Sequence, residues 1–237
     1  MRLVRSSLAL LIVTAAVILG ASPAAAQSDS TKAVAMHGSH LTGGYLIGAF
    51  PMGDWGKIAG FGLALDGSDV IKKRDKVFGI RSNLGLLYNF SRSVDVPSSN
   101  LGPNDKLTIE TKNWSLFFGL GPEISMPGKD VTPFVFGTVG FDTYWTKSEL
   151  SGTATGAPYS AKHGDSRIAF AWSGGLGVRR HVATAYQMEL SAEYRSGIRH
   201  DFLLPEDVKV SGGAVLANRD SHSSDQILVR IGSVFGM

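Results

Sequence analysis

Residues 187–199 alternate between apolar and polar side chains with a period of two. The charges of this stretch all stand at odd positions, namely Glu189, Glu193, Arg195 and Arg199. Such alternation indicates a β-strand with one apolar face and one ionic face. The stretch is thirteen residues long, which suits a membrane crossing, because a tilted transmembrane strand needs about 9 to 11 residues.

The same period of two recurs along the chain and predicts an all-β fold with eight strands. The predicted strands cover residues 41–50, 59–66, 77–90, 113–123, 133–145, 167–179, 186–199 and 226–236. The fifth of them is ambiguous, because Phe134 and Phe136 share a face with Asp142. A β-bulge, or aromatic side chains inside a barrel, could explain this mixed face.

The apolar face of these strands could point toward lipid or toward a soluble core. Glycines gather on the ionic face, as at Gly119, Gly121, Gly175 and Gly177. An eight-stranded barrel has an interior only just wide enough for side chains, so small residues there make room for long ionic ones. Most connections also alternate between short and long, as in outer-membrane barrels. We therefore predict an eight-stranded antiparallel up-and-down transmembrane β-barrel over a soluble ligand carrier.

On this interpretation the ionic faces meet in the lumen. The predicted lumen charge network consists of Asp66, Arg81, Glu123, Asp142, Arg167, Arg179, Glu189, Glu193, Arg195, Arg199 and Arg230. An isolated buried charge costs several kcal/mol, so these groups must pair. A closed lumen follows, because wide aqueous channels belong to barrels of about 16 strands.

Aromatic side chains fall near the two expected membrane boundaries. The predicted interface aromatics are Phe78, Tyr88, Trp114, Phe134, Trp145, Tyr186, Tyr194 and Phe235. Aromatic girdles of this kind mark the places where a barrel passes from lipid to water.

The N-terminal 26 residues are typical of a cleaved signal peptide. Arg2 and Arg5 precede an apolar run at 8–20, and small residues at 24–26 offer a cleavage site. We expect residues 27–39 to form a flexible periplasmic tail and residues 40–237 to form the barrel domain. Export to the outer membrane of a Gram-negative-type bacterium is the predicted localisation.

Composition excludes several classes of function. Removal of the signal peptide lowers the formal net charge from +3 to +1, which gives no footprint for nucleic acid. The chain contains no cysteine, so disulfides and thiolate metal sites are excluded. His37, His40 and His181 could share one side of the barrel, but histidines without a carboxylate make a weak site. We predict no metal and no cofactor.

Possible catalytic residues lie in the polar connections. They are His163, His200 with Asp201, and the run Ser221, His222, Ser223, Ser224 and Asp225. Their spacing does not match lipid A-modifying barrels, and polar loops contain such residues by chance. We predict a protein that is not an enzyme, with no catalytic residues.

Five short segments carry a resemblance to a known family. They cover residues 49–54, 119–123, 133–137, 174–178 and 189–194. With these segments the chain resembles the small outer-membrane β-barrel domain family, which includes the membrane domain of outer membrane protein A and the OmpX and OmpW barrels. The resemblance implies the fold and no catalytic set. Members of this family usually end on an aromatic residue. This chain differs, because its last aromatic residue, Phe235, stands two residues before the end of the sequence.

Together these observations predict a structural or surface-interaction protein of the cell envelope. Its expected partners are outer-membrane lipids, the outer-membrane insertion machinery and an extracellular molecule that meets the long loops. One alternative is a narrow, porin-like channel or a lateral route for small solutes. A second is a lipid A-modifying barrel enzyme.

Overall fold

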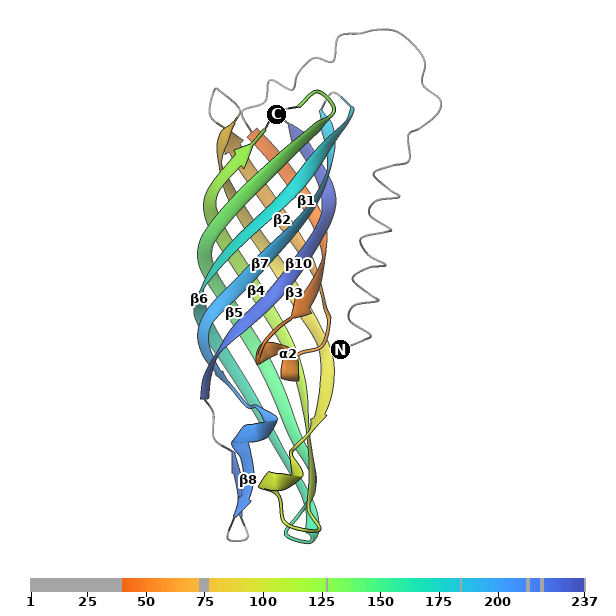
Figure 1. The fold of residues 1–237 in the computed structure, drawn as a ribbon, viewed down its shortest axis with the longest axis vertical. Helices are drawn as coiled ribbons and strands as arrows, with labels where there is room; N and C mark the ends of the chain where they lie inside the picture. Colours follow the sequence, from red (N-terminus) through yellow and green to blue (C-terminus); the bar gives the residue numbers. More distant parts are fainter. Residues whose placement is uncertain are drawn as a thin grey trace, which may run out of the picture.

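The computed structural model describes residues 40–72, 77–126, 128–183, 185–211, 214–217 and 220–236, and it describes only the backbone of residues 198–201, 220 and 221. The predicted signal peptide, tail and His37 lie outside these residues. The described chain forms one closed antiparallel barrel of eight strands (Figure 1). The strands are β1 (His40–Pro51), β2 (Gly62–Lys72), β3 (Phe78–Asp95), β4 (Lys106–Ser125), β5 (Val131–Ala154), β6 (Ala157–Ala183), β7 (Tyr186–Phe202) and β10 (Asp220–Gly236). This confirms the predicted fold class.

Each strand pairs with its sequence neighbour, and β1 closes the ring against β10. The closing register runs from Leu41 opposite Gly236 to Pro51 opposite Gln226. We call the end of the barrel near Leu41 and Gly236 the terminal end. The opposite end, where β5 and β6 meet, is the hairpin end (Figure 1). Every strand therefore has two neighbours within the barrel wall, and no edge is exposed to lipid.

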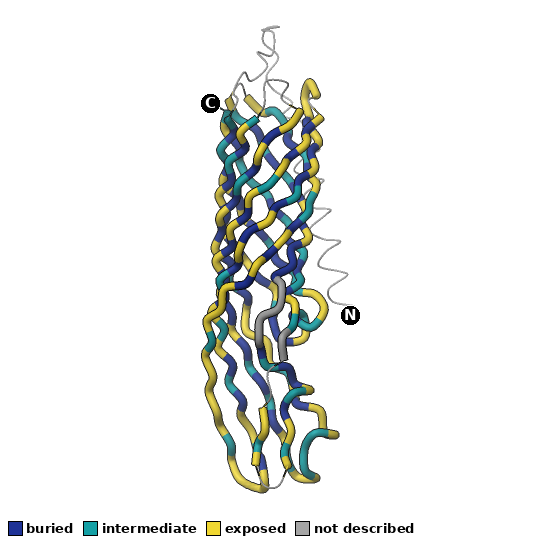
Figure 2. Tube along the Cα trace, turned by 90° about the vertical axis from the view of Figure 1, so that its left-hand side faces the viewer, coloured by how far each residue is buried: buried dark blue, intermediate teal, exposed yellow. Residues whose placement is uncertain are grey.

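Exposed and buried residues alternate along the strands of the barrel (Figure 2). Many large apolar side chains are exposed, whereas the arginines and carboxylates of the opposite face are buried. Leu65 and Ile168 are 70% and 73% exposed, whereas Arg81 and Glu123 are fully buried. A protein in water would have the opposite distribution. The barrel wall is therefore built to face hydrocarbon. None of the helices in the described ranges is both long and apolar enough to cross a membrane.

Four strands continue far beyond the barrel at the hairpin end. β3, β4, β5 and β6 contain 18, 20, 24 and 27 residues. β5 and β6 stay paired to Ala154 opposite Ala157. The intervening Thr155 and Gly156 have φ of 53° and 76°, as the tight turns of two-residue hairpins require. The fifth and sixth strands, predicted to end at 145 and to begin at 167, therefore extend much further than predicted, because a strand outside lipid has a polar outward face and shows weak alternation.

The long connection between β7 and β10 is also folded. It contains the short helix η2 (Pro205–Asp207) and the hairpin of β8 (Val208–Ser211) and β9 (Ala214–Ala217). Val208 packs with buried residues of the extended strands, and η1 (Ser98–Asn100) adjoins β8. This cluster, which we call the hairpin-end core, contains Val96, Leu107, Ile109, Leu150, Ala154 and Val208. The hairpin end is a small folded unit with an apolar interior.

A short helix, α2 (Trp55–Ile58), follows β1 in the connection between the first two predicted strands. Its Trp55 side chain is buried against Tyr144 and Phe202, with ring centroids 5.8 and 5.3 Å apart. Ala59, predicted as the start of the second strand, is instead the residue that ends α2. The helix places apolar bulk across the opening of the barrel at the hairpin end.

Candidate functional site

Two ion-pair clusters fill the lumen, and the first lies toward the terminal end. Arg81 and Arg179 each contact both Glu123 and Glu189. The distances are 3.1 Å from Arg81 Nη1 to Glu123, 2.9 Å from Arg81 Nη2 to Glu189, 2.6 Å from Arg179 Nη1 to Glu123 and 2.8 Å from Arg179 Nε to Glu189. All four side chains are at most 1% exposed. Lys72 Nζ lies 3.9 Å from Glu123 at the edge of this terminal cluster.

The second cluster, which we call the middle cluster, links five side chains in a chain of ion pairs. Asp66 and Glu193 contact Arg230 at 3.0 and 2.6 Å. Glu193 also lies 3.6 Å from Arg195, which is 2.5 Å from Asp142. The residues come from four strands, so the cluster ties opposite sides of the wall together.

The two clusters neutralise each other's charge. Among the described lumen residues, four arginines and Lys72 face five carboxylates. Burying this many charges is costly, and only close pairing with hydrogen bonds offsets the desolvation. The geometry therefore leaves no described lumen carboxylate without a cation.

Aromatic rings fill the spaces between the arginines. Phe134 lies 4.1 Å from the guanidinium carbon of Arg179, and Phe136 lies 4.7 Å from that of Arg81. Cations over ring faces are favourable, more so away from water. The prediction of Phe134 at the lipid interface is therefore wrong: its side chain is buried in the lumen. A Cβ at Gly177 would lie 2.5 Å from this ring, so the glycine makes room for the aromatic group.

The predicted lumen residues are distributed as follows. Nine of them line the two clusters, namely Asp66, Arg81, Glu123, Asp142, Arg179, Glu189, Glu193, Arg195 and Arg230. Arg167 was placed wrongly, because its side chain is 53% exposed beyond the barrel and pairs with Asp165 at 3.2 Å. The side chain of Arg199 lies outside the described residues. Sequence reasoning missed Lys72, because the second strand was expected to end at Asp66.

Polar contacts surround α2 at the hairpin end of the barrel. Lys57 Nζ lies 2.8 Å from Asp54 and 2.5 Å from Glu206, and His222 Nδ1 lies 3.1 Å from Asp54. The hydrogen bond from Lys57 lowers the pKa of Asp54 below its ordinary value. These contacts join the β1–β2 connection to η2 and to the start of β10. We call α2 and these contacts the mouth plug.

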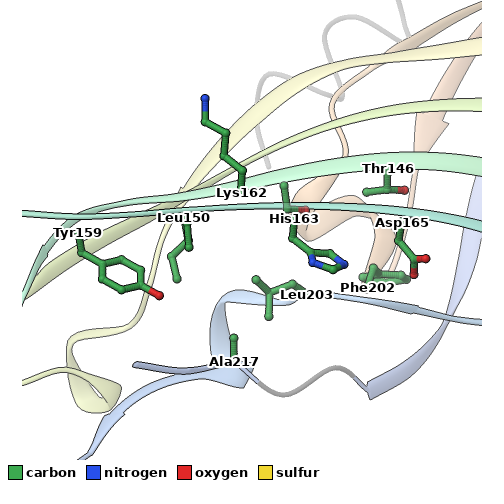
Figure 3. Close-up of a pocket in the computed structure, with 11 residues that line it drawn as sticks. Thr146, Leu150, Tyr159, Lys162, His163, Asp165, Phe202, Leu203 and Ala217 are labelled. Atoms are coloured by element: carbon green, nitrogen blue, oxygen red, sulfur yellow. The ribbon is translucent and has the colours of Figure 1, made fainter. Parts of the chain in front are cut away.

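A cleft of about 200 Å³ opens between the β5–β6 hairpin and the β7–β10 connection (Figure 3). Leu150, Leu203 and Ala217 line its apolar part, and Figure 3 shows His163 and Asp165 on the same side of the cleft. Of the other catalytic candidates, His222 contacts Asp54, and Ser224 lies 2.5 Å from the hydroxyl of Tyr144. Asp225 accepts hydrogen bonds from Ser196 and Ser223 at 2.6 and 3.1 Å. The side chains of His200, Asp201 and Ser221 lie outside the described residues.

The remaining predicted interface aromatics make contacts with aromatic residues of neighbouring strands or are exposed on the wall. Tyr88 pairs with Trp114, and Trp114 pairs with Trp145, across β3, β4 and β5. Tyr194 contacts Trp172 at 5.5 Å, and Tyr186 contacts Phe235 at 5.4 Å. Phe78 is exposed toward the terminal end. No group of three or more potential metal ligands occurs among the described side chains.

Comparison with known proteins gives a fold and no closer relative. No family model and no curated protein matches the sequence. The outer membrane protein OprG from Pseudomonas aeruginosa matches with a TM-score of 0.53 at 14% identity, over 86% of this chain and 98% of that one. A major outer membrane protein from Thermus thermophilus gives a TM-score of 0.47 at 12% identity, over 83% and 99% of the two chains. Neisserial surface protein A gives 0.43 at 9% identity, over 84% and 97%.

The likeness to OprG is one of fold. The evidence that the barrel wall faces lipid comes from this chain itself, because its outward face is apolar and its charges are buried. By its closed eight-stranded ring and the polarity of its two faces, the chain has the fold of a small outer-membrane β-barrel.

Proposed function

We propose that this protein is a closed outer-membrane barrel that holds a folded surface unit outside the cell and acts through that unit in structure or interaction. The terminal end faces the periplasm and the hairpin end faces the exterior. This orientation follows the rule that outer-membrane barrels have short periplasmic turns and long external loops. β4–β5 and β6–β7 are joined at the terminal end by short links, whereas the hairpin end carries the extended strands.

The observation that supports a closed lumen is the set of ion pairs that cross it, whose charges sum to zero. Arg179 reaches from β6 to Glu123 on β4, and Arg195 reaches from β7 to Asp142 on β5. An ion that passed through would have to break such pairs while the pairs themselves are buried, which costs several kcal/mol for each. The mouth plug adds a second, apolar obstruction.

The folded hairpin end supports a role in interaction. Its hairpin-end core and its paired strands hold the surface in one conformation. A partner that binds such a surface does not have to order flexible loops, which is a cost that weakens many complexes. Catalysis is not part of the proposal, because His222, Ser224 and Asp225 make structural contacts. The insertion machinery would meet the strand that carries Phe235.

Planar-bilayer recording of the purified barrel tests the closed lumen. We expect no unit conductance from the wild type. A matched variant should gain conductance: Arg230→Ser with Glu193→Ser and Asp66→Ser removes three of the five side chains of the middle cluster and changes the net charge by one unit. Steady unit conductance from the wild type would refute the closed lumen and favour the narrow channel. Liposome swelling with small sugars would then show whether neutral solutes pass.

The interaction role and the alternative enzyme role are separated in cells. Deletion of residues 148–163, which removes the outer part of the hairpin, should abolish surface interaction while leaving the barrel folded. Mass spectrometry of lipid A from cells with and without the gene tests the enzyme role. A change in lipid A that depends on the gene would contradict the proposal.

A further inference from the structure

Three rows of side chains cross the outward face of β4, β5 and β6 just beyond the apolar belt. The strand register places Trp114 opposite Trp145 and, two residues further out, Lys112 opposite Lys147. Lys147 is in turn opposite Gly164 of β6. We call the set of Lys112, Lys147 and Gly164 the lysine row. It lies directly beyond the aromatic pair that marks the edge of the belt.

The row beyond it mixes charges. Glu110 stands opposite Glu149, and Glu149 stands opposite Lys162. Lys112 Nζ lies 3.1 Å from Glu110, and Lys162 Nζ lies 3.4 Å from Glu149. Lys147 has no acidic partner among the described side chains. It faces another lysine across the strands, and like charges in directly opposed positions are destabilising.

The lysine row borders a hollow that could hold a ligand. The hollow measures about 370 Å³ and is lined by the three lysines, both glutamates, Ser148, His163 and Gly164. A Cβ added at Gly164 would meet no atom within 4 Å, so the space beside this residue of the hollow is open. An anion placed here would relieve the repulsion between Lys112 and Lys147.

The position of the hollow selects the kind of anion. On its membrane side the wall presents exposed apolar side chains, including Leu116, Phe118, Phe141, Trp114 and Trp145. A ligand with an anionic head at the lysine row and acyl chains along these residues would satisfy both regions. Basic residues beside a membrane surface attract anionic headgroups. The carboxylates of Glu110 and Glu149 would accept hydrogen bonds from sugar hydroxyls.

We propose that Lys112, Lys147 and Lys162 form a site for the phosphate of a phosphorylated glycolipid in the outer leaflet, of the lipid A kind. The phosphate binds between Lys112 and Lys147, its sugar reaches Glu110 and Glu149, and its acyl chains lie against the aromatic pair. The site rests on the proposed orientation, in which the hairpin end faces the exterior, and is independent of whether the lumen is closed.

Native mass spectrometry of the detergent-purified barrel, titrated with purified lipid A, tests the site. Lys112→Gln with Lys147→Gln should weaken lipid A binding roughly tenfold to thirtyfold, as expected for two lysines near a charged surface. The control variant Lys129→Gln with Lys209→Gln removes two exposed lysines away from the row and should bind like the wild type. Heat-modifiable migration on gels verifies that each barrel is folded. If the double variant does not fold, the single variant Lys147→Gln replaces it in the titration.

A stability measurement distinguishes the site from a merely structural role. In detergent without lipid, Lys147→Gln should unfold at an equal or higher temperature than the wild type, because it removes the repulsion with Lys112. With lipid A present, the order should reverse. Inorganic phosphate and dephosphorylated lipid A should each stabilise the wild type less than intact lipid A.

Three results would overturn the proposal: equal lipid A binding by the double variant and the wild type, equal binding of the dephosphorylated lipid, or full protection by inorganic phosphate alone. The orientation is tested separately. A protease site inserted between Thr155 and Gly156 should be cut on intact cells. If the inserted site is cut on intact cells but the lysine variants bind lipid A like the wild type, only the glycolipid site is refuted. If the inserted site is resistant on intact cells but cut in lysates, the proposed orientation is refuted.

Discussion

Glu189 is the side chain whose replacement tests the charge-paired lumen most directly. It is 1% exposed and lies 2.9 Å from Arg81, 2.8 Å from Arg179 and 3.1 Å from the hydroxyl of Tyr45. Glu189→Leu leaves the terminal cluster with Glu123 as its sole described carboxylate against two arginines and Lys72. Removal of one partner from a buried ion pair typically costs about 3 to 5 kcal/mol. We therefore expect a loss of that size in the free energy of unfolding.

The assay is urea unfolding of the barrel in lipid vesicles, followed by tryptophan fluorescence. Glu149→Leu is the control, because Glu149 forms an exposed pair with Lys162, and exposed pairs contribute about 0 to 1 kcal/mol. Glu189→Leu combined with Arg81→Met should recover part of the loss, since an apolar pair can replace a buried ion pair at little cost. A loss below about 1 kcal/mol for Glu189→Leu, comparable with that of an exposed pair, would refute the pairing argument.

Three further substitutions probe the wall, the lumen and the mouth plug. Leu84→Arg should reduce the folded fraction on heat-modifiability gels, because arginine on the lipid face near the midplane costs about 2 to 4 kcal/mol. The control Leu216→Arg, at a similarly exposed site outside the belt, should leave the folded fraction unchanged. Equal effects of the two variants would contradict the lipid-facing assignment of Leu84. Gly177→Ala should lower the unfolding midpoint, because overpacking costs about 1 to 3 kcal/mol. The control Gly174→Ala, whose Cβ would have no neighbour nearer than 4.0 Å, should have little effect. A larger loss for Gly174→Ala than for Gly177→Ala would show that the aromatic rings in the lumen can move aside. Trp55→Ala should lower the free energy of unfolding, measured in urea, by about 3 to 5 kcal/mol, because it truncates a buried aromatic side chain. It should leave the bilayer conductance unchanged, because the ion pairs in the lumen remain. New conductance would show that the mouth plug, and not the ion pairs, closes the barrel.

The period of two was enough to predict the barrel because lipid imposes it. Wherever one face meets hydrocarbon and the other meets buried charge, alternation is strict, as around Glu189 and Arg195. Beyond the belt both faces can be polar, so the extension of β5 and β6 past Trp145 left no such pattern. The strand ends therefore could not be predicted.

The errors inside the lumen have a different origin. Phe134 was assigned to the lipid boundary because aromatic residues near a strand end usually lie there, although it stands on the ionic face with Phe136, where a position inside the lumen was an open alternative. Their contacts with Arg179 and Arg81 depend on which residues three strands bring together, and the register is not encoded locally. The same is true of Trp55, whose partners Tyr144 and Phe202 are distant in the sequence.

The pairing of β5 with both of its neighbours continues without interruption from Val139 almost to Thr155, and this has a mechanical consequence. A pull on the tip along the strand direction loads the hydrogen bonds between β4 and β5 in shear, so that many must yield at once. A flexible loop of equal length would stretch before it transmitted force. A cell tethered by this tip would pass tension straight into its own envelope.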